Sequence, residues 1–195
     1  MSGISKISET GFWSGDNAHV HHVHSKPLSD WICKFLAEDK DKRIYDCGAG
    51  LGNYLKDLAD AGFTDLVGFE GDIPVNKAFA GIWKQDLTKP IDPTVFSKKG
   101  NVLFLEVGEH ISAEFQDQLL QNIKYLCNGY LIMSWAVRGQ AGFGHVNCLD
   151  NGEVTQIMEK YGFKYLHGYS QDARVVIDDT TPWFKNTIMI FSRWK

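Results

Sequence analysis

The segment spanning residues 43–62 constrains the fold of this 195-residue chain more than any other. It reads RIYDCGAGLGNYLKDLADAG: a short apolar run, a glycine turn, and then apolar residues at spacings of three and one that form one face of a helix. Gly48, Gly50 and Gly52 let the backbone turn sharply between the two elements, and Gly62 is placed to end the helix. A buried strand joined to a helix by such a turn is the building unit of α/β folds.

The same alternation continues along the chain. Strands are expected at 43–47, 65–70, 82–87, 101–107, 129–135, 163–169 and 186–194, and helices at 27–37, 51–59, 112–126 and 151–161. Because strands that alternate with helices connect by right-handed crossovers, the pattern predicts a mostly parallel sheet with helices on both faces. The polar segment 170–185 shows no helical pattern, so the last strand is expected to run antiparallel to the others.

Composition excludes several classes of protein. The net charge of −4, without a basic run, disfavours a dedicated nucleic-acid binder, because phosphate contacts need clustered Lys and Arg. The four cysteines form no CxxC pair, which favours a reduced, cytoplasmic protein. The first residues lack the apolar core of a signal peptide. The longest apolar stretch, YLIMSWAV, is too short to span a bilayer, so no membrane association is expected.

Acidic residues follow the first three strands, where α/β folds bind their ligands. Asp46 stands two positions before the first glycine of a GxGxG turn, and a carboxylate there suits a cationic ligand better than the pyrophosphate of a GxGxxG loop. Glu70, twenty residues beyond Gly50, is placed to accept hydrogen bonds from the hydroxyls of a ribose; otherwise it is a solvated strand-end acid. Asp86 either accepts from an adenine amino group or caps a turn.

These segments resemble a known family. YDCGAGLGNYLKDL, VGFEGD and QDL are similar to the first three motifs of class I S-adenosylmethionine-dependent methyltransferases, and LFLEVGEHI resembles the fourth strand and following segment of many small-molecule methyltransferases. SWAVRGQAGFGHVN and PWFKNTIMIF resemble a less-characterised branch of that class. The resemblance runs from about residue 30 to 193 and implies a Rossmann-like, seven-stranded sheet with S-adenosylmethionine as cofactor. It does not specify the methyl acceptor.

The resemblance also implies roles for individual residues and segments. The residues expected at the cofactor are Asp46, Gly48, Ala49, Gly50 and Gly52 for its amino-acid portion, Glu70 and Gly71 for the ribose, Ile73, Asp86 and Leu87 for the adenine, and Glu106 near the sulfonium. Residues 1–25 are expected to form a lid over a single domain, whose core spans 26–195. The protein is expected to be a monomer or homodimer.

Two histidines are candidates for the general base that an alcohol acceptor requires. His110 lies four residues beyond Glu106 and is the first candidate, although a loop-orienting role is the alternative. His145 is the second, in the glycine-rich segment after the fifth strand. Residues expected to contact the acceptor are His22, Trp135, Arg138, His145, Asn147 and Trp183, with Phe143 as a further flat wall. Core or rim packing is the alternative for the aromatic residues.

The run HVHHVH, residues 19–24, holds four of the seven histidines of the chain. Three interpretations remain open: a metal site, a lid in which one or two imidazoles touch acceptor or cofactor, or a solvated loop. Asp16 is the only acid nearby, a stable metal site needs more ligands than a histidine pair, and nothing else in the expected chemistry needs a metal. No metal site is therefore expected.

The sequence favours O-methylation of a small hydroxyl-bearing molecule, such as a sugar or glycan precursor. The first alternative is a nucleic-acid methyltransferase, which is disfavoured because the chain has no basic patch and carries EVGEH where an NPPY-type tetrad would follow the fourth strand. The second alternative is a non-catalytic module that binds S-adenosylmethionine.

Overall fold

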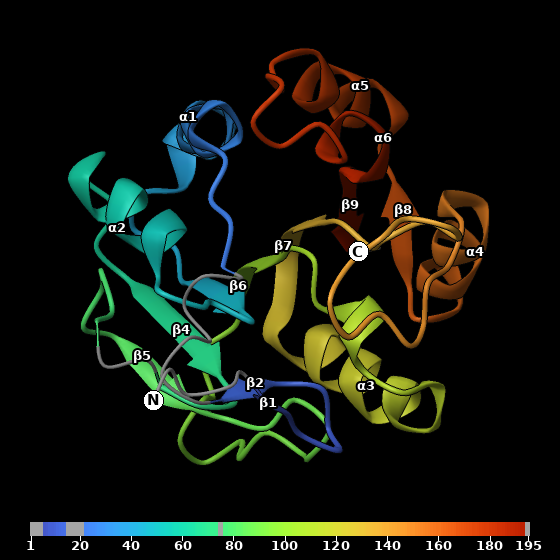
Figure 1. Ribbon diagram of the computed structural model, residues 1–195. Coiled ribbons are helices and arrows are strands. Elements are labelled where there is room, and N and C mark those ends of the chain that lie inside the picture. The colour runs from blue at the N-terminus through green and yellow to red at the C-terminus, as the bar shows by residue number, and fades with distance from the viewer. Residues whose placement is uncertain (1–5, 15–21, 74–75, 194–195) are drawn as a thin grey trace.

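The computed structural model describes residues 6–14, 22–73 and 76–193. Within these ranges a mixed sheet has the strand order β5–β4–β3–β6–β7–β9–β8 (Figure 1). Its strands are β3 (Ile44–Cys47), β4 (Leu66–Glu70), β5 (Ile82–Lys84), β6 (Gly100–Phe104), β7 (Cys127–Met133), β8 (Phe163–Tyr165) and β9 (Met189–Arg193). β9 pairs antiparallel with both of its neighbours, whereas β3 to β7 pair in parallel. The expected seven-stranded, mostly parallel sheet with an antiparallel last strand is confirmed.

Helices cover both faces of the sheet (Figure 1). They are α1 (Lys26–Phe35), α2 (Asn53–Asp60), α3 (Gln116–Leu126), α4 (Asn151–Lys160), α5 (His167–Val175) and α6 (Phe184–Thr187), with short 3₁₀ turns η2 (Ala37–Asp39), η3 (Gly108–His110) and η4 (Ala113–Phe115). None of the helices in the described part of the chain has the length and apolar character needed to cross a lipid bilayer.

Successive strand residues face opposite sides, which divides the core into two layers. Val102 and Phe104 of β6 pack against α3 and α4, whereas Leu103 between them packs with α1, α2, α5 and α6. The same alternation holds in β9, where Phe191 joins the first layer and Ile190 the second. Strands that are apolar on both faces are typical of a parallel sheet covered by helices on both sides.

Two expected elements are partly wrong. The strand expected at 163–169 ends at Tyr165, and α5 occupies part of the segment that was expected to be irregular. The strand expected at 186–194 begins only at Met189, because α6 takes its first residues. The buried face of α5 carries small residues, Ser170 and Ala173, so its sequence lacks the large apolar residues that mark an amphipathic helix. The Ser170 hydroxyl accepts a hydrogen bond from the Ile190 backbone N–H at 2.9 Å, which fixes the helix to β9.

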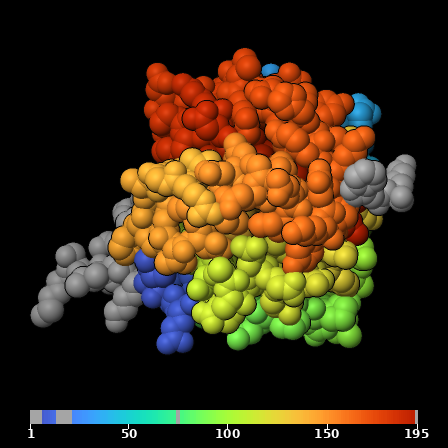
Figure 2. All heavy atoms as spheres, turned by 90° about the vertical axis from the view of Figure 1, so that its right-hand side faces the viewer, coloured from blue at the N-terminus to red at the C-terminus, as the bar shows by residue number. Residues whose placement is uncertain are grey.

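A two-stranded hairpin precedes the core. Its strands are β1 (Lys6–Ile7) and β2 (Trp13–Ser14), and it lies beyond the carboxyl end of β4 (Figure 1). A Cβ on Gly71 would lie 2.3 Å from the Phe12 ring, and a Cβ on Gly144 would lie 2.4 Å from Ile7 Cδ1. In Figure 2 the blue hairpin residues accordingly sit beside the light-orange segment that follows β7. The hairpin therefore packs on the edge of the sheet where ligands of α/β folds bind.

Candidate active site

A cavity of about 340 Å³ opens at the carboxyl ends of β3, β6 and β7, and a smaller one of about 80 Å³ adjoins it toward β4. Both are lined by residues from the hairpin, the glycine turn and the segment after β6; the residues common to the two are Trp13, His22, Gly48, Glu106 and His110. The parallel strands end at the same edge, so polar residues far apart in sequence meet there.

The glycine turn approaches its neighbours closely. Gly48 and Gly50 have φ values of 86° and 53°, which residues with a side chain rarely adopt. A Cβ on Gly50 would lie 2.6 Å from Nδ1 of His22, so the end of the histidine run rests on this turn. Gly52 lines neither cavity. It is the N-cap residue of α2 and has a φ of 79°.

Asp46 is the buried acid in front of the glycine turn. It is 2% exposed, and its Oδ2 has no hydrogen-bond partner among the described residues. Burial, and secondarily the charge of Glu70, raises the pKa of Asp46 to about 7. A buried carboxylate without a partner is costly, and a cationic ligand group in the larger cavity would offset that cost.

Glu70 and Asp86 lie at the smaller cavity. The two carboxylate oxygens of Glu70 accept backbone N–H groups of Gly50 and Gly71, both at 2.8 Å, while burial raises its pKa. Asp86 Oδ1 accepts from the backbone N–H and the hydroxyl of Thr88, at 2.9 and 2.7 Å, so this acid caps the turn after β5. Leu87 lines the same cavity as both acids, whereas Ile73 lines neither cavity.

Two glutamates follow β6 on the floor of the larger cavity. Glu106 has φ 54° and accepts from Gln140 Nε2 at 3.0 Å, but its Oε1 has no hydrogen-bond partner within the described ranges. Glu109 is fully buried, and its oxygens make no hydrogen bond of normal geometry within the described ranges, although the Ala136 backbone and the Glu106 side chain approach them. Burial raises the pKa of both, and the charge of Glu106 raises that of Glu109 further.

Two histidines meet beside these glutamates. The rings of His110 and His145 lie with centroids 5.0 Å apart at 71°. His110 Nδ1 lies 3.2 Å from the Gly144 carbonyl and His145 Nδ1 lies 3.1 Å from the Gln140 carbonyl. Because a carbonyl only accepts, each Nδ1 carries the hydrogen in these contacts, and each Nε2 keeps its lone pair. Burial, and then the charge of His145, lowers the pKa of His110 to about 4.

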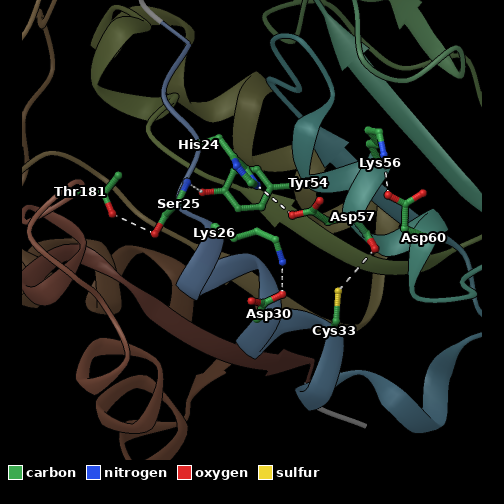
Figure 3. Close-up of polar contacts among 10 residues, drawn as sticks. All are labelled: His24, Ser25, Lys26, Asp30, Cys33, Tyr54, Lys56, Asp57, Asp60 and Thr181. Atoms are coloured by element: carbon green, nitrogen blue, oxygen red, sulfur yellow. Dashed lines mark hydrogen bonds and ion pairs between the residues drawn. The ribbon is translucent and has the colours of Figure 1, made fainter.

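The described part of the histidine run reaches the cavity. His22 and His24 line it, and the Trp13 ring lies 5.3 Å from the His22 ring and 5.0 Å from the His110 ring. Figure 3 shows His24 against the Tyr54 ring, with a contact to Asp57 of α2 in which His24 Nε2 lies 3.2 Å from Asp57 Oδ2. His19 and His21 lie outside the described residues.

The residue after the run is fixed to the core from two sides. Ser25 donates its backbone N–H to the Tyr54 hydroxyl at 3.1 Å, and its own hydroxyl accepts from Thr181 at 2.9 Å (Figure 3). All of these groups are buried. The chain directly after the cavity-lining residues 22–24 is therefore anchored to α2 and to the chain before α6.

Three expected acceptor contacts lie elsewhere. Trp135 is 1% exposed and donates its indole N–H to the Asn147 carbonyl at 2.6 Å, so both residues belong to the packing beneath the cavity. Arg138 is exposed and paired with Glu153 on α4 at 2.6 Å. None of the three lines the cavity, whereas Trp183 does.

Glu109, Gln140 and Trp13 are among the cavity residues that the sequence analysis did not identify. Glu109 stands three positions after Glu106 and directly before His110, and that spacing, typical of one face of a 3₁₀ turn, could have indicated it. Gln140 and Trp13 line the cavity from a loop and from the hairpin. No periodicity in the sequence marks those two.

Comparisons with known proteins identify the fold. No known protein-family profile matches the sequence, and no curated protein matches it. Solved structures do match: magnesium protoporphyrin IX methyltransferase from Synechocystis PCC 6803 with bound S-adenosylhomocysteine has a TM-score of 0.61 at 17% identity, covering 85% of this chain and 82% of that one. The sugar N-methyltransferase KedS8 from Streptoalloteichus has a TM-score of 0.64 at 12% identity, covering 87% and 88%.

A third match is the [4+2]-cyclase SpnF, with a TM-score of 0.59 at 14% identity, covering 94% of this chain and 86% of that one. The strand order and these matches together define the class: the chain has the Rossmann-like fold of class I S-adenosylmethionine-dependent methyltransferases. The cyclase shares that fold, so the reaction has to be argued from the residues of the site.

Proposed function

We propose that this protein is an S-adenosylmethionine-dependent methyltransferase that acts on a small hydroxyl-bearing acceptor, with a sugar or glycan precursor as the favoured type. The buried carboxylate of Asp46 beside the GxGxG turn, whose Oδ2 has no hydrogen-bond partner among the described residues, is the observation that carries the proposal. S-adenosylmethionine has a positively charged ammonium group in its amino-acid portion, which offsets the cost of this buried charge. Residues 46–50 hold that portion, and Glu70, Gly71, Asp86 and Leu87 lie along the smaller cavity with the adenosine.

The cavity supports a small acceptor over a nucleic acid. Its volume of about 340 Å³ is at the lower end of the range for small-molecule sites. No Lys or Arg is among the described residues that line either cavity, so a phosphate chain finds no cationic partner there. Phe143, Trp183 and Trp13 provide flat surfaces, and Gln140 with the histidines provides hydrogen-bonding groups, a combination that suits a sugar ring.

Methyl transfer to oxygen needs alignment and the removal of one proton. The protein aligns the acceptor oxygen, the methyl carbon and the sulfur, since the sulfonium already activates the methyl group. As the O–C bond forms and the C–S bond breaks, the hydroxyl proton passes to a neutral imidazole. With a pKa of about 4, His110 is neutral at pH 7, and its Nε2 lone pair is available; His145 is the second candidate.

The proposal is tested by a transfer screen with methyl-labelled S-adenosylmethionine against sugars, nucleotides and other small metabolites. A sugar or another hydroxyl compound should become labelled, and NMR of the product should place the methyl group on oxygen. Label found only on nitrogen would overturn O-methylation, and label found on tRNA or DNA with a steep salt dependence would favour the nucleic-acid alternative. If the protein binds S-adenosylhomocysteine but labels nothing, the non-catalytic alternative is favoured. The cytoplasm is the proposed location, in keeping with four free thiols.

A further inference from the structure

We infer that Glu109, His110 and His145 form a binding site for a divalent metal ion at the acceptor end of the cavity, where the ion binds the acceptor hydroxyl. This inference rests on the proposed function and deepens it, because the methyl donor and the ion lie on either side of the acceptor oxygen. The site differs from the metal site considered for residues 19–24, none of which belongs to it.

The three residues converge closely enough to share one ion. One ligand atom from each lies within 4.8 Å of the others, so small side-chain movements would bring all three to metal–ligand bonds of about 2 Å. His145 Nε2 lies 4.0 Å from Glu109 Oε1, and these side chains are 11% and 0% exposed. Glu109 and His110 are adjacent on η3, and His145 comes from the loop after β7, so two separate segments close on the same point.

The backbone orients both imidazoles as ligands. The Gly144 carbonyl accepts from His110 Nδ1 and the Gln140 carbonyl accepts from His145 Nδ1. A metal-binding histidine commonly donates its other ring N–H to a carbonyl or carboxylate in this way, which fixes the ring and makes the ligand nitrogen more basic. The two histidines therefore keep their Nε2 lone pairs available as ligands.

Charge supplies the second, independent reason. Glu109 is fully buried, and neither of its oxygens makes a hydrogen bond of normal geometry with a described residue, although the Glu106 side chain and the Ala136 backbone lie close to it. Oε1 of Glu106, which lines the same cavity, is likewise without a described partner. Two carboxylates in one buried space repel each other, and no Lys or Arg among the described lining residues compensates them. A dication would.

The ligand set indicates the type of ion. Imidazole nitrogens with a carboxylate suit Mn²⁺, Fe²⁺, Co²⁺ or Zn²⁺, whereas Mg²⁺ and Ca²⁺ prefer oxygen ligands throughout. Three protein ligands leave coordination positions open, as in catalytic rather than structural sites. An acceptor hydroxyl in an open position becomes more acidic. Its proton passes to Glu106, the oxygen forms the bond to the methyl carbon, and the sulfur leaves with the electrons of the broken C–S bond.

His110 would have different roles in the two proposals, as a metal ligand or as the proton acceptor. If His110 is a ligand, a chelator abolishes methyl transfer and added Mn²⁺ restores it. If His110 is the proton acceptor, the chelator leaves transfer unchanged. The metal site is tested first by binding, because binding does not require the acceptor to be known.

The experiment titrates chelator-treated protein with MnCl₂ and follows the electron paramagnetic resonance signal of free Mn²⁺. One equivalent should bind, and Glu109→Gln and His145→Ala should each weaken binding at least about tenfold, since even groups that only orient ligands are worth about 10- to 100-fold in affinity. The matched controls are Glu159→Gln and His167→Ala, which change an exposed Glu and an exposed His and should leave binding unchanged.

A further control excludes the histidine run. His19→Ala with His21→Ala in the same chain should retain the bound equivalent, because the inferred ligands are Glu109, His110 and His145. Absence of Mn²⁺ binding up to millimolar concentration, or binding that survives both Glu109→Gln and His145→Ala, overturns the inference. Calorimetry with S-adenosylhomocysteine on the same samples checks that the variants are folded. It also separates the two proposals: binding of S-adenosylhomocysteine without binding of Mn²⁺ would overturn the metal site and leave the proposed function standing.

Discussion

Replacing Asp46 by Asn should stabilise the ligand-free protein at alkaline pH, although a substitution in a buried site is usually destabilising. The folded chain holds the Asp46 proton up to a pKa of about 7, against 3.8 for the ordinary carboxyl. The folded state therefore binds more protons than the unfolded state between these values, and its stability falls as pH rises through that interval. The full cost above pH 7 is about 4 kcal/mol, because each pKa unit is worth about 1.4 kcal/mol.

An asparagine in the same place carries no charge, so its cost does not depend on pH. That cost is about 1–3 kcal/mol for an amide left without a hydrogen bond. The free energy of unfolding of Asp46→Asn, relative to the natural chain, should therefore rise by about 2–3 kcal/mol between pH 5 and pH 8. Urea unfolding followed by circular dichroism at both pH values measures this difference.

A control and a refutation are available for this prediction. Asp60 lies on the exposed end of α2 in an ion pair with Lys56, and Asp60→Asn should change stability equally little at both pH values. If Asp46→Asn shifts stability by the same amount at pH 5 and pH 8, the carboxyl is not held in an uncompensated state. Asp46 would then not be a buried negative charge that favours a cationic ligand.

Three further outcomes are expected. The contribution of His110 to stability should fall by about 3 kcal/mol between pH 7 and pH 4, because its pKa is lowered to about 4 and the unfolded state takes up a proton that the folded state does not; in urea unfolding, the stability of His110→Asn relative to the natural chain should therefore rise by about 3 kcal/mol as pH falls from 7 to 4. Trp135→Phe leaves the Asn147 carbonyl without its 2.6 Å partner and should cost about 1–3 kcal/mol of unfolding free energy, with S-adenosylhomocysteine affinity unchanged in calorimetry. Arg138→Ala should leave kcat/KM for the acceptor unchanged, because this side chain pairs with Glu153 outside the cavity; a large loss would return it to the acceptor site.

The sheet could be predicted from the sequence because its strands are apolar on both faces. Runs such as those at 44–47 and 131–133 are buried along their whole length, so local composition is enough to find them. Helix α5 could not be predicted, because its contact with β9 depends on Ser170 and Ala173, whose small side chains carry no amphipathic signal. Close packing of small residues is a property of the tertiary structure.

The candidate site likewise has residues that could be predicted from the sequence and residues that could not. Asp46 and His110 could be placed because they follow strands, and strand ends of a parallel sheet meet at one edge. Trp135 was misplaced because being near a strand end does not fix the direction of a side chain. It lies two residues beyond Met133 and therefore shares the face that packs on α3 and α4. Contacts from the hairpin, such as that of Trp13, depend on a chain path that the sequence does not encode locally.

Calorimetric titration of the purified protein with S-adenosylhomocysteine tests the central claim most directly. One equivalent should bind with saturation, and Asp46→Asn should weaken the binding because the ligand ammonium loses its buried counter-charge, while the exposed variant Asp60→Asn should bind as the natural chain does. Absence of binding by both S-adenosylhomocysteine and S-adenosylmethionine, in a protein shown to be folded, would contradict the assignment of this cavity to the methyl donor.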